Sequence, residues 1–133
     1  MNNDLPSILL DFRNDRIRVN KATLNTLGNP TNIMLLVNPE AGCICIKAGD
    51  PDDPTTHRIA SQRQPGNVYY ELHSKHLMGI LLQCSDWDSK KNYRLAGRVM
   101  GKEQEIKVLY DFKGSVCVTV DDAKQKTEAE RKQ

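Results

Sequence analysis

The spacing of hydrophobic residues changes part-way along residues 17–28 (IRVNKATLNTLG). Ile17 and Val19 alternate with polar residues, which is the period of a strand with one buried face. Leu24 and Leu27 are three residues apart, which is the spacing of one face of a helix. The segment therefore predicts a short strand that runs directly into a short helix.

Residues suited to helix ends flank this helix. Asn20 is a good N-cap, Gly28 can take the left-handed conformation that ends a helix, and Pro30 prevents its continuation. Similar reasoning predicts a second helix over 75–84. Further strands are expected at 7–12, 32–37, 43–48, 68–72, 93–100, 105–110 and 112–120, the last of them broken by Gly114.

A second copy of the strand-to-helix unit is expected at 68–84. When the two copies are aligned, Val19 falls on Leu72 and Leu24 on Leu77. The order strand, turn, strand, short helix, hairpin then occurs twice, although the match is one of pattern and not of identity. We interpret the chain as a possible internal duplication, with chance similarity as the alternative.

The predicted fold class is α+β, mainly a β-barrel of two pseudo-symmetric strand-strand-helix-hairpin repeats. One globular domain is expected over 1–120, with repeat halves at about 7–48 and 57–120. The acidic, proline-containing linker 49–56 separates them, because proline pairs poorly in a sheet. Each half is too small to bury enough surface alone, so the halves should share one core. Residues 121–133 have no apolar side chain larger than Ala and predict a polar tail.

This order of elements resembles the swapped-hairpin AbrB-type domain, and two copies in one chain resemble the MraZ arrangement. Residues 16–28 (RIRVNKATLNTLG) and 33–47 carry the resemblance. Family members commonly have a proline where this chain has Asn20. The family is largely DNA-binding and uses basic residues near the first hairpin and the helix start. The resemblance therefore implies DNA contacts from Arg13, Arg16, Arg18 and Lys21.

The charge balance permits such a role only locally. A formal net charge of +2 argues against a polycation that coats nucleic acid, but it allows one basic face. The N-terminus lacks the pattern of a signal peptide, and no run of about 18 apolar residues is present. No membrane association is expected. The chain has four cysteines, Cys43, Cys45, Cys84 and Cys117. They form no CxxC pair and no disulfide framework, which favours a cytoplasmic location.

The first basic cluster has two interpretations. Arginine side chains on a hairpin can donate bidentate hydrogen bonds to phosphates. Alternatively, Arg16 and Arg18 lie on the solvent face of their strand and only keep it soluble, with Asp11 and Asp15 beside them.

A second basic cluster surrounds Trp87. Aromatic and basic residues together can stack with and neutralise a nucleic acid. The basic members are Lys90, Lys91, Arg94 and Arg98. The alternative is that Trp87 closes one end of the core.

Three further groups are weaker candidates. The first group is His57, His73 and His76 with Cys84. His73 and His76 have a spacing that suits a metal, but without a third ligand at fixed spacing no metal site is expected. Cys43 and Cys45 can share one strand face, but their alternation with Ile44 and Ile46 favours inert packing in a strand buried on both faces. The acidic cluster Asp50, Asp52 and Asp53 could bind a hard cation, but two prolines and the lack of a downstream ligand favour a plain acidic linker.

The predicted function is that of a cytoplasmic bacterial DNA-binding or transcription-regulatory protein of AbrB/MraZ-like type, with double-stranded DNA as partner. No phosphate loop, nucleophile elbow or acid–base pair at recognisable spacing is present, so neither an enzyme nor a cofactor is expected. The alternative is a non-catalytic protein-interaction or assembly module, whose partner is a second copy or another protein.

Overall fold

The computed structural model describes residues 5–62, 64–102 and 105–118. The predicted tail at 121–133 and the basic residue Arg63 lie outside this part. No helix of the described residues is long and apolar enough to cross a membrane. The strands are β1 (Ser7–Asp11), β2 (Arg16–Asn20), β3 (Asn32–Asn38), β4 (Cys43–Ala48), β5 (His57–Arg58), β6 (Tyr69–His73), β7 (Asn92–Met100), β8 (Lys107–Asp111) and β9 (Val116–Val118). The helices are α1 (Lys21–Thr26) and α2 (Lys75–Gln83), with 3-10 turns η1 (Phe12–Asn14), η2 (Ala60–Gln62) and η4 (Phe112–Gly114).

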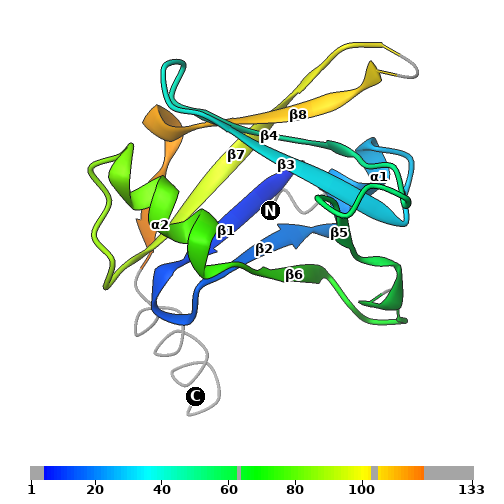
Figure 1. Ribbon diagram of the computed structural model, residues 1–133, viewed down its shortest axis with the longest axis horizontal. Helices are drawn as coiled ribbons and strands as arrows, with labels where there is room; N and C mark the ends of the chain where they lie inside the picture. The colour runs from blue at the N-terminus through cyan, green and yellow to red at the C-terminus, as the bar shows by residue number, and fades with distance from the viewer. Residues whose placement is uncertain (1–4, 63, 103–104, 119–133) are drawn as a thin grey trace, which may run out of the picture.

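The strands form a nearly closed antiparallel barrel, and the predicted mainly-β fold is confirmed. Its strand order is β5-β3-β4-β8-β7-β1-β2-β6, and β9 pairs with β7. Figure 1 shows β3, β4 and β8 in the upper part of the view and β1, β2 and β6 in the lower part, with α1 and α2 at opposite ends of the barrel. The long strand β7 joins the two groups, because it pairs with β1 along its first part and with β8 along its second.

Side chains from alternate strand positions fill the barrel. Ile17 and Val19 of β2 are buried, as are Ile8 and Leu10 of β1, which confirms the strand period read from the sequence. Each such aliphatic side chain contributes about 1.5–3 kcal/mol when fully buried. The remaining core includes Leu24, Ile33, Ile44, Ile46, Ile59, Tyr70, Leu72, Met78, Leu81, Leu95, Val108 and Tyr110.

A side-chain amide bridges the seam between β5 and β6, where the barrel is not closed by a strand pair. Nε2 of Gln62 donates to the Glu71 carbonyl at 2.9 Å, and the Glu71 N–H donates to Oε1 of Gln62 at 2.8 Å. The amide thus satisfies both backbone groups of Glu71, as a neighbouring strand would do.

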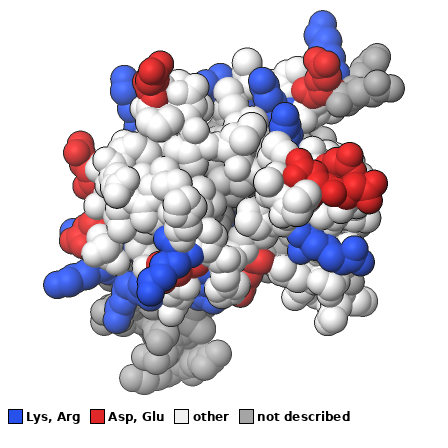
Figure 2. All heavy atoms as spheres, viewed as in Figure 1, with Lys and Arg blue, Asp and Glu red and all other residues white. Residues whose placement is uncertain are grey.

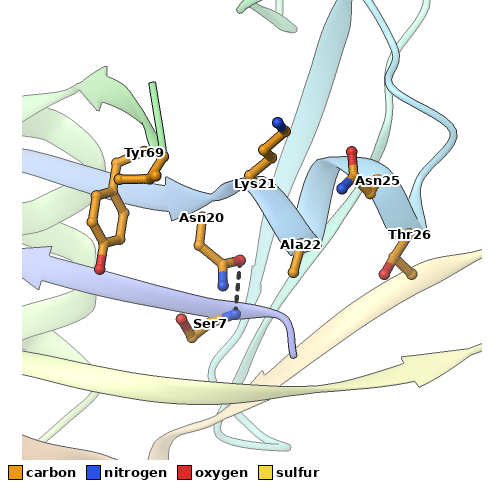
Figure 3. Close-up of a pocket in the computed structure, with 8 residues that line it drawn as sticks. Ser7, Asn20, Lys21, Ala22, Asn25, Thr26 and Tyr69 are labelled. Atoms are coloured by element: carbon orange, nitrogen blue, oxygen red, sulfur yellow. Dashed lines mark hydrogen bonds between the residues drawn. The ribbon is translucent and has the colours of Figure 1, made fainter. Parts of the chain in front are cut away.

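The junction between β2 and α1 is organised around Asn20, as Figure 3 shows. Its side-chain oxygen accepts from the N–H of Thr23 and from the N–H of Ser7, each at 3.0 Å. Its amide nitrogen donates to the Leu5 carbonyl at 2.8 Å. The Thr23 hydroxyl also contacts the buried Tyr110 hydroxyl at 2.5 Å. The predicted N-cap is confirmed, and it also ties α1 to β1 and β8.

The last predicted strand, 112–120, is interrupted. The chain pairs with the second part of β7 up to Tyr110, forms the turn η4, and pairs again with the first part of β7 through β9. The turn lets the Phe112 ring pack on Trp87, with ring centres 4.8 Å apart. Residues 119–120 lie outside the described part of the chain.

The predicted linker at 49–56 folds into turns. A side-chain oxygen of Asp53 accepts from both the N–H and the hydroxyl of Thr55, at 2.9 and 2.7 Å. The hydroxyl bond lowers the pKa of Asp53. Thr56 in turn accepts from the buried Asn32 at 2.9 Å, which fixes the linker against the start of β3.

Candidate nucleic-acid interface

The barrel brings the two basic clusters of the sequence together. Strand β1 lies between β2 and β7, and Leu9 is the register partner of both Arg18 and Arg94. Paired residues on neighbouring strands point to the same face, so these three side chains form one row on the outer surface. With strands about 4.8 Å apart, the two arginines start from positions about 10 Å apart. We call the outer face of β6, β2, β1 and β7 the hairpin face.

Arg16 is held on this face by a buried carboxylate. Asp11 is 1% exposed, and its Oδ2 accepts from Arg16 Nε and from Asn14 Nδ2, each at 2.8 Å. The Asn92 amide, with its nitrogen turned toward Asp11, donates to the other carboxylate oxygen at 3.2 Å. Arg16 is therefore anchored at one edge, which leaves only part of its guanidinium for other partners.

Glu71 meets both hairpin arginines from the neighbouring strand. Its Oε1 lies 3.2 Å from Arg18 Nε and 3.3 Å from Arg16 Nη1. The Arg18 guanidinium also lies 5.9 Å from the centre of the Tyr69 ring. The positive charge of the predicted cluster is thus partly neutralised within the protein.

Three further cations lie at one end of the hairpin face. Arg13 lies two residues after Asp11, in the turn η1, and Lys90 and Lys91 directly precede Asn92, the β7 partner of Asp11. All three are exposed, and within the described residues no ion pair is found for them. Figure 2 shows Lys and Arg side chains gathered at the lower left, over the β1–β2 turn and the start of β7, with some acidic side chains beside them.

The other two predicted basic residues lie elsewhere. Arg98 forms a two-bond ion pair with Asp111 at 2.7 and 3.3 Å, which lowers the pKa of the carboxyl group. Lys21 begins α1 beside an open groove. In Figure 3 its side chain points to the same side of α1 as Asn25 and away from Ser7. Neither residue extends the row of Arg18 and Arg94.

Trp87 packs among aromatic rings of the protein. It stacks on Tyr93 with ring centres 5.3 Å apart, and Phe12 lies 5.9 Å away. The indole N–H donates to the Ser115 hydroxyl at 3.1 Å. These contacts favour the interpretation that Trp87 closes one end of the core over that of a base-stacking platform.

The cysteine and histidine candidates show no assembled site. His73 and His76 are exposed, and the Cys84 thiol donates to a carbonyl of its own helix at 3.1 Å. No group of three potential metal ligands is found in the described part of the chain. Cys43 and Cys45 lie on the outer side of β4, and burial raises the pKa of Cys45, which keeps it a thiol.

An apolar strip lies on the outer face of β3, β4 and β8. Leu36 is the register partner of Cys45, which is the partner of Leu109. Leu36 is 45% exposed, and the three residues line a shallow groove bordered by Arg98 and Asp111. We call this surface the apolar face. One sign of this face is visible in the sequence: residues 32–37 are almost wholly apolar, so apolar side chains lie on both faces of this strand.

Comparison of the chain with protein-family models, with curated proteins and with solved structures finds no match. A functional proposal therefore has to rest on the structure itself, and its two candidate surfaces are the hairpin face and the apolar face.

Proposed function

We propose that this protein binds double-stranded DNA through the hairpin face and acts as a regulatory protein of AbrB/MraZ-like type. The observation that carries the proposal is the β1–β7 pairing, which sets Arg94 beside the hairpin that holds Arg18. Arg13, Lys90 and Lys91 stand at the end of the same face. Two basic segments that are distant in the sequence thus present one surface.

The chemistry of this surface suits phosphates. Arginine donates two parallel hydrogen bonds to a phosphate, and lysine supplies a mobile point charge. The hairpin face and its end carry four exposed cations for which no ion pair is found in the described chain: Arg13, Lys90, Lys91 and Arg94. Four phosphate contacts predict a slope of about −3.6 for log affinity against log salt.

An internal duplication is part of the same proposal, and the strand pairing supports it. Strand β2 pairs with β6, its expected counterpart, and β4 pairs with β8. Both helices begin in the same way, since Asn20 accepts from the N–H of Thr23 and Ser74 from the N–H of Leu77. The halves contribute unequally to DNA binding, because only the first carries the arginine hairpin.

Binding of the whole chain to a random-sequence duplex tests the proposal. The affinity is measured by fluorescence anisotropy at 50 and 200 mM salt, with a single strand of the same sequence as control. A slope near −3.6 corresponds to a loss of about 150-fold over this range. Absence of duplex binding at 50 mM, or equal affinity at both salt concentrations, would show that the hairpin face is not a DNA-binding surface.

A protein-interaction module is the second candidate, and the exposed Leu36 in the apolar face favours it. If this surface mediates self-association, Leu36→Glu should convert an oligomer to a monomer in sedimentation and leave DNA affinity unchanged. If the wild-type chain is monomeric at high concentration, self-association through the apolar face is excluded.

A further inference from the structure

Glu71 occupies a central position on the hairpin face. It is the register partner of Arg18, and one carboxylate oxygen accepts from both hairpin arginines. Its side chain is 34% exposed, so solvent and ligands reach it. Carboxylate and phosphate present similar pairs of oxygen atoms to a guanidinium. Glu71 therefore stands where a phosphate bound to these arginines would stand.

We propose that Glu71 determines the affinity and selectivity of the hairpin face, by competing with phosphates for Arg18. This inference rests on the proposed DNA binding. In the free protein the carboxylate holds the guanidinium, and a DNA phosphate has to displace it and tolerate the remaining negative charge. The residue acts through Arg18 and limits binding.

The two acidic residues near the hairpin arginines differ in a way that supports this assignment. The Asp11–Arg16 contact is short, at 2.8 Å, and its carboxylate is buried and held by further donors. The Glu71 contacts are longer, at 3.2 and 3.3 Å, and both partners are partly exposed. Partly exposed ion pairs of this kind contribute little to stability. Glu71 is thus the exchangeable partner, whereas Asp11 is a fixed one.

The competition also gives selectivity for polyanions. Release of Arg18 from Glu71 has the same free-energy cost for every anion. A small anion that contacts Arg18 alone has only one interaction to offset this cost. A duplex also contacts Arg94 and the cations beyond it, so the same cost is offset by several interactions. Removal of the carboxylate should therefore increase affinity and add about one phosphate contact to the salt dependence.

The test compares Glu71→Gln with Glu40→Gln. Glu40 is exposed in the β3–β4 turn, so the control has the same chemical change and the same change in net charge. Binding of the full chain to the random-sequence duplex is measured at 50 and 200 mM salt. We expect E71Q to bind three- to tenfold more tightly than wild type, with a slope steeper by about 0.9. E40Q should match wild type within twofold.

Several outcomes overturn the inference. Equal gains in E71Q and E40Q indicate an effect of net charge alone, and weaker binding by E71Q indicates that Glu71 orients Arg18 for DNA. Wild-type binding that E71Q does not improve overturns this inference and leaves the proposed function intact. Absence of binding by both proteins overturns the proposed function as well. Glu71→Thr, which keeps a strand-favouring side chain, provides the same comparison if E71Q does not fold.

Discussion

Arg18 and Arg94 flank Leu9 on the outer surface of the barrel, each one strand away from it. The relationship exists because β1 pairs with β2 on one side and with β7 on the other. It converts two modest basic segments into one surface in a chain of nearly balanced charge. The proposed DNA binding depends on this surface, and the barrel that supports it depends on a few polar contacts.

The first prediction concerns Asn20. Asn20→Ala removes the helix cap and leaves the Ser7 N–H without its side-chain acceptor, so the free energy of unfolding should fall by about 2 kcal/mol or more. Urea denaturation measures this change. Asn25→Ala is the control, since Asn25 is exposed on α1 and has no side-chain hydrogen bond in the described chain. Its effect should stay within about 0.5 kcal/mol; equal losses in the two variants would contradict the role given to Asn20.

The second prediction separates the two interpretations of Trp87. Trp87→Phe loses the hydrogen bond to Ser115 and part of the ring packing, so stability should fall by about 1 kcal/mol. Duplex affinity should change less than twofold, because the indole packs on protein rings. Denaturation and anisotropy together measure both quantities. A large loss of affinity without a loss of stability would support the base-stacking role instead.

The third prediction is a pH dependence of stability. Burial lowers the pKa of His57 below its ordinary value of 6.5. The unfolded chain therefore binds a proton at His57 at higher pH than the folded chain does. The contribution of neutral His57 to the free energy of unfolding is fully present above pH 6.5. Stability should decrease as the pH falls below 6.5 and through the lower folded pKa.

Urea midpoints at pH 7.5 and 5.5 measure this effect. His57→Gln should reduce the difference between the two midpoints, whereas His76→Gln, at an exposed position of α2, should leave it as in wild type. An unchanged difference in H57Q would mean that another group causes the pH dependence.

The local elements could be predicted from the sequence because their causes are local. The change from strand to helix period and the cap at Asn20 depend on neighbouring residues, and both are confirmed. A break at Gly114 was expected in the last strand, and the turn η4 ends at this residue. The pairing of both β8 and β9 with β7 was not predicted, because it depends on which parts of β7 remain free to pair.

The candidate site was predictable only as two separate clusters. Their meeting depends on the β1–β7 pairing, which no local pattern encodes. Glu71 was overlooked for the same reason: in the sequence it is one polar position of a strand, and its partner Arg18 becomes visible only through the β2–β6 register. In the sequence Arg98 and Arg94 are equivalent candidates for DNA contacts. In the structure β8 pairs with β7, and its Asp111 forms an ion pair with Arg98.

The most direct test of the central claim compares two double variants in duplex binding. Arg18→Ala/Arg94→Ala removes both arginines of the row, whereas Lys47→Ala/Lys107→Ala removes two paired, exposed cations from β4 and β8. Net charge changes equally in both. We expect the arginine variant to lose at least about tenfold in affinity and about 0.9 units of salt slope, because Arg94 is one of the four counted phosphate contacts and Arg18 is held by Glu71. The lysine variant should stay within about twofold of wild type. Equal losses in the two variants, or no loss in the arginine variant, would contradict a DNA-binding hairpin face.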